Sequence, residues 1–395
     1  MGKPNKIVFV STYIPRECGI ATYTNNLMNA IKQADPSTKI EVIAMNDGKS
    51  YEYSEIVKQT IDQNIVDEYK KAAEWINSSK IDVVSIQHEF GIFGGFNGRN
   101  ILEFLKYVKK KKIITFHTIP IVKSKPFLIR AKRSKSRIKL MRQICAEVDG
   151  ITVMIEEAKK FLVEKVGCPE DKINVIPHGA PKITISEIKQ FQKEKVAIEE
   201  IKTSDFVIST FGLISPKKGI EYVIKAMPGI LRANPDRNIK YLILGKTHPQ
   251  KPLDYWKSLV SLTKKMNLEK NVLFYPKYME CNEIYKFLSN TDLYITPYYV
   301  REQSSSGTLS YAFACGRCVV STPYVFAEEI IKRSNVGELV DFKDSESISK
   351  VINNLIKNPS LIKKYADNSY EIGKSIEWKK IGEDFLNFFN RDEKK

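Results

Sequence analysis

Short apolar runs rich in Val and Ile recur along the chain, and each is followed by a longer stretch in which apolar residues return every three or four positions. The runs are typical of buried parallel strands and the stretches of amphipathic helices. In the first half they are "KIVFVST" from Lys6, "IEVIAM" from Ile40, "DVVSIQHE" from Asp82, "KKIITFHT" from Lys111, "GITVM" from Gly150 and "INVIPHG" from Ile173. In the second half they are "DFVISTFGLI" from Asp205, "KYLILGK" from Lys240, "NVLFYP" from Asn271, "DLYITPY" from Asp292, "CVVSTPY" from Cys318 and "GELVDF" from Gly337. This alternation predicts an α/β protein with two doubly wound parallel sheets.

The length of the chain also indicates two domains. At 395 residues it exceeds the roughly 250–300 residues at which one hydrophobic core stops growing. A polar segment rich in Lys and Glu separates the two series of strands. We therefore expect a first domain at 1–181, a linker containing a helix at 182–204, a second domain at 205–375 and a last helix at 376–395.

The chain carries a formal net charge of +17, and much of this charge is local. Nine basic residues lie between Lys123 and Arg142 with no acidic residue before Glu147. Such a positive field attracts nucleic acid, anionic lipid headgroups or phosphorylated small molecules. The alternative is that these residues form the solvated face of a lysine-rich protein. No apolar stretch approaches the ~18–20 residues of a membrane span, so we expect a cytoplasmic protein.

Cysteines and histidines bear on metal binding and on the position of a site. The six cysteines are scattered, and the CxxC of Cys315 and Cys318 has no second pair at zinc spacing, so we expect reduced thiols and no metal. The four histidines each lie at or just after the end of a predicted strand: His88, His117, His178 and His248. Ligands of doubly wound sheets bind beyond the carboxyl ends of the strands, which favours a cleft position over the alternative of core histidines.

Two loops of the first domain are candidates for ligand contact. A helix is predicted to begin near Gly19, where free N–H groups and a small residue suit an anion, although an ordinary tight turn would have the same pattern. The loop "QHEFGIFGGFNGR" holds four glycines after His88 and Glu89, and these two side chains could hydrogen-bond sugar hydroxyls. The alternative for this loop is simple flexibility.

Two loops of the second domain suit an anion. Lys217 and Lys218 precede Gly219 and a predicted helix, which points to phosphate, although lysines are also common at helix starts. In "REQSSSGTLSYAFACGR" the carboxyl-terminal part predicts a short helix. Glu302 and Gln303 before it can bind neutral hydroxyls. The residues expected to offer hydroxyls and N–H groups to an anion are Ser304, Ser305, Ser306, Gly307 and Thr308.

Together these segments resemble the retaining glycosyltransferases of the GT-B fold, family 4, over nearly the whole chain. "FGLISPKKGIEYVIKAM" resembles the family's G-R-L-x-x-x-K-G segment, and "REQSSSGTLSYAFACGRCVVSTPY" resembles the segment with two glutamates eight residues apart. "CGIATYT", "QHEFGIFGG" and "TFHTIP" are similar to a branch often assigned to mannosyl transfer. The resemblance implies two Rossmann-like domains facing a central cleft, the first on the acceptor side and the second binding a nucleotide sugar. It also implies that the last helix crosses back to the first domain.

The resemblance implies roles for residues that match the family motifs. His117, Lys218 and Glu302 become the catalytic candidates, Lys218 by lying on the diphosphate and His117 by lying against the transferred sugar. Donor-binding residues are expected to be Gly19, Gly212, Lys217, Lys218, Glu302, Gln303, Ser304, Ser305, Ser306, Gly307 and Thr308. The acceptor or sugar side is expected to hold Arg16, His88, Glu89, His117 and His178. The family requires no metal or other cofactor.

The sequence departs from the family pattern at two places. Leu213 stands where the family has an arginine, and the replacement cation could be Lys217, Arg301 or Arg16. Counting back from the helix, Tyr311 takes the place of the second glutamate and Gln303 that of the first; if Glu302 is the first, Ser310 becomes the second. In either register the acid that normally grips the ribose is missing.

The expected activity is transfer of a hexose, with GDP-mannose as the first donor considered, to a saccharide or lipid-linked saccharide. We also expect the basic stretch Lys123–Arg142 to contact an anionic membrane surface peripherally. Another GT-B enzyme, an epimerase or phosphorylase, is the nearest alternative. A dinucleotide-dependent oxidoreductase would need a G-x-G-x-x-G fingerprint after a strand, which this sequence does not have. A nucleic-acid-binding protein would need aromatic residues interleaved with basic ones, and the basic stretch does not have that pattern.

Overall fold

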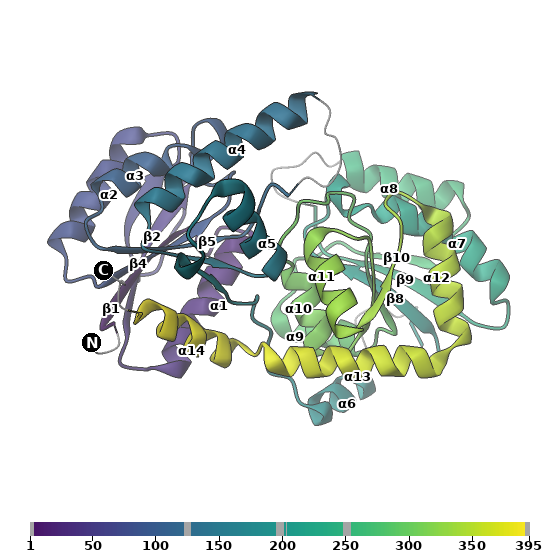
Figure 1. Cartoon of the computed structure of the whole chain (residues 1–395). Coiled ribbons are helices and arrows are strands. Elements are labelled where there is room, and N and C mark those ends of the chain that lie inside the picture. Colours follow the sequence, from purple (N-terminus) through teal and green to yellow (C-terminus); the bar gives the residue numbers. More distant parts are fainter. Residues whose placement is uncertain (1–3, 122–127, 195–200, 203, 248–253, 392–395) are drawn as a thin grey trace. The chain divides into compact units, whose positions relative to one another are not determined.

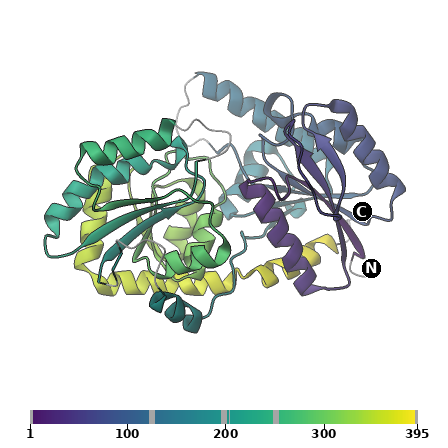
Figure 2. The same ribbon diagram turned by 180° about the vertical axis from the view of Figure 1, so that it is seen from behind.

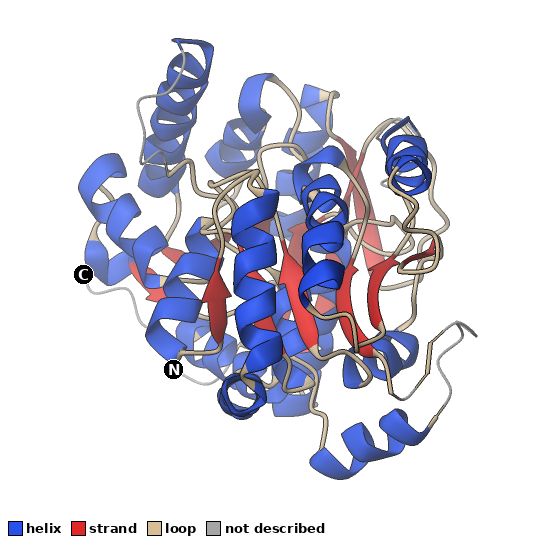
Figure 3. Ribbon diagram, turned by 90° about the vertical axis from the view of Figure 1, so that its right-hand side faces the viewer, coloured by secondary structure: helices blue, strands red, loops and turns tan. Residues whose placement is uncertain are grey.

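The computed structural model describes residues 4–121, 128–194, 201–202, 204–247 and 254–391. The chain forms two compact units, each built around one parallel sheet with helices packed on it (Figures 1 and 3). Unit 1 comprises Met1–Gly179, Glu302–Ser305 and Trp378–Lys395. Unit 2 comprises Ala180–Arg301 and Ser306–Glu377.

Unit 1 holds a seven-stranded sheet in the order β3-β2-β1-β4-β5-β6-β7, and every neighbouring pair is parallel. The strands are β1 (Lys6–Ser11), β2 (Lys39–Asn46), β3 (Val57–Asp62), β4 (Val83–His88), β5 (Lys111–Phe116), β6 (Gly150–Val153) and β7 (Ile173–Val175). The apolar runs predicted six of these strands. They missed β3, which reads VKQTID and lies at the edge of the sheet, where only Ile61 is fully buried. An edge strand packs one face at most, so its sequence lacks a continuous apolar run.

The helices of unit 1 are α1 (Gly19–Ala34), α2 (Val66–Ser78), α3 (Ile101–Tyr107), α4 (Leu128–Glu147), α5 (Glu156–Phe161) and α14 (Trp378–Phe389). A π-helical turn, Leu162–Val166, continues α5, and short 3-10 turns occur at Phe96–Gly98 and Glu170–Lys172. α1 begins at Gly19, as its apolar spacing predicted. Side chains of residues 128–132 in α4 are not described.

The last helix belongs to unit 1 and lies beside α1 (Figures 1 and 2). Gly382 permits this contact, because a Cβ atom at this position would lie 2.4 Å from the backbone carbonyl of Ala30. The buried side of α14 consists of large apolar side chains: Ile381, Phe385, Leu386, Phe388 and Phe389. The amine of Lys111 donates to the carbonyl of Phe389 at 2.9 Å and so satisfies one of the unpaired groups at the end of the helix.

Unit 2 holds a six-stranded parallel sheet in the order β10-β9-β8-β11-β12-β13. Its strands are β8 (Phe206–Phe211), β9 (Ile239–Leu244), β10 (Val272–Tyr275), β11 (Leu293–Thr296), β12 (Cys318–Ser321) and β13 (Gly337–Leu339). Each coincides with a predicted run, and β9 begins one residue before its run. The helices are α6 (Ile185–Lys193), α7 (Ile220–Ala233), α8 (Asp254–Lys265), α9 (Cys281–Ser289), α10 (Gly307–Ala314), α11 (Val325–Ser334), α12 (Ser345–Lys357) and α13 (Pro359–Ser375). α6 lies in the segment expected to be a linker, starts at a capping box of Thr184 and Glu187, and packs on α9.

Candidate functional site

Lys218 lies at the carboxyl edge of the unit 2 sheet and is held there by two glycines. The chain leaves β8 through Gly212 (φ 127°), forms a 3-10 turn over Pro216–Lys218, and enters α7 through Gly219 (φ 64°). Both φ values suit glycine, and a Cβ at Gly219 would lie 2.1 Å from the carbonyl oxygen of Pro297. The turn therefore packs directly against the residues that follow β11. This close approach brings Lys218 to Tyr298.

The ammonium group of Lys218 is surrounded by neutral groups. Its Nζ donates to the Tyr298 hydroxyl at 2.6 Å and lies 4.0 Å from the centroid of that ring. The Tyr298 hydroxyl is 3.2 Å from Oγ1 of Thr308, and a Cβ at Gly212 would be 3.8 Å from Nζ. We call Gly212, Lys218, Tyr298 and Thr308 the lysine site. Burial lowers the pKa of Lys218 from its usual value to about 8.

The start of α10 adjoins the lysine site through the hydroxyl of Thr308, which lies 3.2 Å from that of Tyr298. Ser306 caps the helix, its hydroxyl accepting from the N–H of Leu309 at 3.4 Å. The first N–H groups of a helix have no acceptor within the helix, and the positive end of its dipole favours an anion. Among the ion pairs of the described residues, none involves Lys218. A half-buried cation beside a helix amino terminus, with no carboxylate paired to it among the described residues, suits a phosphate group.

The cations considered as replacements for the absent arginine at Leu213 differ in their partners. The guanidinium of Arg301 pairs with Glu328 at 2.9 Å. Arg16, in unit 1, is buried, pairs with Asp47 at 3.5 Å and donates to the carbonyl of Met45. Lys217 is exposed to solvent. Arg16 and Arg301 thus have their charge matched by carboxylates, whereas Lys217 is the candidate whose side chain lies in water.

Lys246 is a further cation at this edge that the motif comparison missed. It lies two residues after the end of β9, and its carbonyl accepts from the N–H of Ile214 at 2.8 Å, which places it next to Leu213 across the sheet edge. Its amine lies 5.8 Å from the ring centroid of the exposed Tyr278. The rule that ligands bind beyond strand ends would have found Lys246, since it ends the run "KYLILGK".

The position of the missing ribose acid is occupied by aromatic packing. Tyr311 is nearly buried, stacks on Tyr285 with ring centroids 6.1 Å apart, and meets the edge of Phe211 at 5.9 Å. Ser310, the alternative position, is fully buried and donates to the carbonyl of Ser306. Neither residue offers a carboxylate to a ribose.

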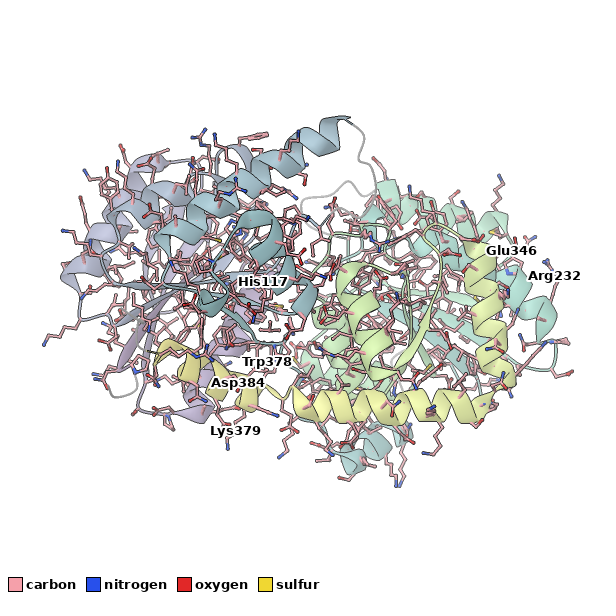
Figure 4. The ribbon with its side chains drawn as sticks, viewed as in Figure 1. His117, Arg232, Glu346, Trp378, Lys379 and Asp384 are labelled. Atoms are coloured by element: carbon pink, nitrogen blue, oxygen red, sulfur yellow. The ribbon has the colours of Figure 1, made fainter. Side chains whose placement is uncertain are left out.

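His117 lies at the carboxyl edge of the unit 1 sheet, directly after β5. Its Nε2 is 3.0 Å from Oε1 of Gln87, a buried β4 residue that sequence analysis did not single out. The edge of the Tyr23 ring meets the His117 ring at a centroid distance of 4.6 Å, and Tyr23 also contacts His178 and Trp378. Figure 4 labels His117 and Trp378, both in unit 1. Burial lowers the pKa of His117 to about 3 and that of His178 to about 4, so both rings are neutral near pH 7.

His88 is part of the packing beneath this edge. Its ring is fully buried among Phe90, Phe93 and Phe116, and neither ring nitrogen has a hydrogen-bond partner among the residues that the structure describes. Its carbonyl accepts from the N–H of His117 at 3.1 Å. The structure therefore places His88 behind His117, away from solvent. His248 lies outside the described residues.

Residues Glu302–Ser305 pack with unit 1, against the segment after β5. Gln303 forms an antiparallel bridge with Thr118, and the hydroxyls of Ser304 and Ser305 each donate to the carbonyl of His117 at 3.1 Å. We expected the hydroxyls of Ser304 and Ser305 to donate to an anion. In the structure they donate to the His117 carbonyl and so hold this loop in place. The Ser306 hydroxyl, likewise, accepts from its own helix. Of the expected anion ligands, Gly307 and Thr308 stand at the start of α10.

The acidic candidates lie near a cation in unit 1. Oε2 of Glu89 accepts from the Thr118 hydroxyl at 2.5 Å. The Arg137 guanidinium, on α4, lies 4.2 Å from the Phe90 ring centroid. Burial lowers the pKa of Arg137, while the charges of Glu89 and Glu302 oppose this shift. The structure therefore brings Glu89, Glu302 and His117 to one edge of unit 1, and Lys218 to the corresponding edge of unit 2.

Sequence and structure comparisons identify relatives along the whole chain. The Glycosyltransferase Family 4 model matches residues 18–181, and the Glycosyl transferases group 1 model matches residues 191–372. An uncharacterized glycosyltransferase of Methanocaldococcus jannaschii is 24% identical over 407 aligned positions that cover 99% of each chain. Sucrose-phosphate synthase of Thermosynechococcus elongatus has a similar structure, with a TM-score of 0.75, 15% identity and 98% of each chain covered. Anabaena HepE, solved with UDP and glucose, has a TM-score of 0.71 at 15% identity over 96% of this chain and 98% of its own. The chain therefore belongs to the GT-B glycosyltransferases, with a Glycosyltransferase Family 4 domain followed by a Glycosyl transferases group 1 domain.

Proposed function

We propose that this glycosyltransferase moves a hexose from a nucleoside diphosphate sugar to a saccharide or lipid-linked saccharide, with retention at the anomeric carbon and without a metal. The observation that carries the proposal is the lysine site. A diphosphate leaving group gains negative charge as its bond to the sugar breaks. The Lys218 ammonium and the amino terminus of α10 are fixed in position to stabilise that charge without reorganising.

The proposed reaction needs no nucleophile from the protein, because the acceptor hydroxyl attacks the sugar directly. The bond from the anomeric carbon to the diphosphate oxygen breaks, and an acceptor hydroxyl forms the new bond on the same face. The acceptor's proton passes to the departing diphosphate. His117 is neutral, so its part is to hydrogen-bond a sugar or acceptor hydroxyl rather than to supply positive charge. Glu302 lies on the loop fixed to the His117 carbonyl by Ser304 and Ser305 and would bind hydroxyls of the transferred sugar.

The donor is proposed to be GDP-mannose, from the resemblance of the first-domain loops to mannosyl-transferring relatives. UDP-glucose is the rival donor, since Anabaena HepE was solved with UDP and glucose. A thermal-shift series with GDP, UDP and ADP and their sugars separates the two, because a ligand that binds only the folded state raises its apparent stability. Product analysis with and without an acceptor separates a transferase from an epimerase, which converts the donor alone.

Replacement of Lys218 tests the proposed function directly. Lys218→Ala should lower the transfer rate roughly a hundredfold or more, as expected when a preorganised charge at a leaving group is lost, and should leave the protein folded. The matched control is Lys225→Ala, which removes an exposed lysine from α7, the helix that follows Lys218. Transfer by Lys218→Ala at the rate of the control would overturn the role of this lysine.

Contact with an anionic membrane surface is proposed for α4 and the neighbouring glycine-rich loop. Within the described residues no helix is long and apolar enough to cross a bilayer. The basic stretch Lys123–Arg142 begins outside the described residues, but α4 exposes Arg133, Lys135 and Lys139. Next to this helix the Asn97 side chain is hydrogen-bonded to Ser136, and the adjacent Phe96 is 66% exposed. Exposed cations beside an exposed aromatic ring suit an anionic lipid interface.

Vesicle sedimentation tests this contact. The protein should bind vesicles that contain phosphatidylserine more tightly than vesicles of phosphatidylcholine alone, and salt should weaken the binding. Lys135→Glu/Lys139→Glu should reduce binding, whereas Lys264→Glu/Lys265→Glu, the same charge change on exposed positions of α8, should not. Equal loss in both variants would show that net charge, and not this surface, is responsible.

A further inference from the structure

The cation of the lysine site is held by a phenol instead of a carboxylate. The Tyr298 hydroxyl accepts from Lys218 at 2.6 Å, and the same ring lies beneath the ammonium at 4.0 Å. A tyrosine ring thus makes both a hydrogen bond and a cation–π contact with one amine. Neither contact neutralises the charge, as a carboxylate would.

Tyr298 is itself held in one orientation. Its side chain is 1% exposed and stacks on Tyr324 with ring centroids 5.1 Å apart and an angle of 18° between the rings. Its carbonyl accepts a hydrogen bond from the Thr322 hydroxyl, and its hydroxyl lies 3.2 Å from Thr308 Oγ1. The Tyr298 hydroxyl therefore links the cation to the first turn of α10. A flexible four-carbon lysine side chain is fixed by a rigid ring.

We propose that Tyr298 is the positioning residue of the lysine site, which holds the Lys218 ammonium beside the amino terminus of α10 while leaving its full charge for the donor diphosphate. The inference rests on the proposed function, in which that diphosphate binds here. A carboxylate at this place would hold the amine equally well but would have to be displaced by the incoming anion. A neutral acceptor imposes no such competition.

The position of the Lys218 ammonium matters more for anion binding because the family arginine is absent. Leu213 contributes no charge, and Arg301 and Arg16 are paired with Glu328 and Asp47. A site that has lost one of two clamping cations depends more on the placement of the one that remains, here the half-buried Lys218. Loss of the Tyr298 hydroxyl should therefore weaken anion binding.

A double-mutant cycle tests the proposal, with inorganic pyrophosphate as the probe and calorimetry as the measurement. Tyr298→Phe keeps the ring and its stacking and removes only the hydroxyl. It should weaken pyrophosphate binding roughly tenfold, the scale of one hydrogen bond to a charged group. In the Lys218→Ala background the same substitution should change affinity less than about twofold, because Tyr298 acts through the lysine.

Tyr241→Phe is the matched control, because it removes another buried tyrosine hydroxyl of unit 2, bonded to Thr210 at 3.1 Å, without touching Lys218. It should leave pyrophosphate binding unchanged. Additive effects of Tyr298→Phe and Lys218→Ala, equal affinity of Tyr298→Phe and the unmodified protein, or a failure of the unmodified protein to bind pyrophosphate would each overturn the positioning role.

The transfer assay separates this inference from the proposed function. Pyrophosphate binding that follows the predicted cycle, in a protein that forms no glycoside, would keep the role of Tyr298 and refute the activity. In an active enzyme, Tyr298→Phe should lower kcat, because the misplaced charge no longer meets the diphosphate as it leaves. A rise in KM with kcat unchanged would assign the hydroxyl to uniform binding and contradict positioning for the leaving group.

Discussion

At the scale of single residues, burial sets the charge state of the groups that the proposed reaction uses. His117 and His178 are kept neutral because an imidazolium would lose its hydration at the edge of the unit 1 core. Lys218 remains largely charged near pH 7 because its pKa falls only to about 8. Burial lowers the pKa of both groups. The histidine in unit 1 becomes neutral at pH 7, whereas the lysine in unit 2 stays a cation because its usual pKa is much higher.

The pKa of Lys218 predicts how donor binding depends on pH. Below about pH 8 the amine is protonated, so affinity for a nucleoside diphosphate should be highest there and should fall as pH rises toward 9.5. Calorimetric titration with GDP or UDP above about pH 7, where the terminal phosphate is already ionised, measures this slope. Lys218→Ala should bind weakly with a much flatter profile.

Loss of stability does not account for that fall. A lysine whose folded pKa lies below its unfolded value makes the unfolded state bind more protons between the two values, so its contribution to stability rises with pH over that window. Thermal melting at the same pH values provides the check. A binding profile that stayed flat in the unmodified protein up to about pH 9.5 would refute the lowered pKa.

At the scale of elements, apolar runs predicted twelve strands because a parallel strand covered on both faces must be continuously apolar. β3 escaped since it is half exposed at an edge. The candidate site was predicted less completely. Lys218 and His117 follow from their places after strands, but Tyr298 lies in "ITPYYV" and looks like any core aromatic. Its role depends on a contact between segments 80 residues apart, which no local pattern encodes.

Ser304 and Ser305 show the same limit in the other direction. A serine run before a helix is typical of an anion loop, yet these hydroxyls donate to the carbonyl of His117, 187 and 188 residues away in the chain. Only Ser306 has a partner that its position relative to the helix would predict, the N–H of Leu309. Local sequence identifies donors and acceptors; tertiary packing decides which of them pair.

The contact between α1 and α14 gives a prediction at this scale. Gly382→Ala should destabilise the protein although alanine favours helix by about 1 kcal/mol, because the added methyl would lie 2.4 Å from the Ala30 carbonyl and force the helices apart. We expect a net loss of about 1–3 kcal/mol in urea unfolding. Gly19→Ala is the control, since nothing lies within 4 Å of its Cβ position. Equal stability of the two variants would contradict the close helix contact.

At the scale of the whole molecule, the chain leaves unit 1 near Gly179, forms unit 2, and returns to unit 1 with its last helix. Unit 1 is therefore incomplete until α14 has been made. Gly179 and Trp378 are close at this return, because a Cβ at Gly179 would lie 2.3 Å from the Trp378 ring. The aromatic contacts of Trp378 with Tyr23 and His178 then tie the last helix to the candidate site of unit 1.

Truncation after Glu377 tests this dependence. It removes α14, whose five large buried apolar side chains each contribute about 1.5–3 kcal/mol, a total comparable with the stability of a whole domain, about 5–15 kcal/mol. Calorimetry should show the unit 1 transition lost or strongly lowered, while unit 2, with the lysine site intact, still binds nucleoside diphosphate. Truncation after Arg391 is the control, because it leaves α14 in place. If removing α14 left both transitions unchanged, the last helix would not be needed for the stability of unit 1 or of the site around His117.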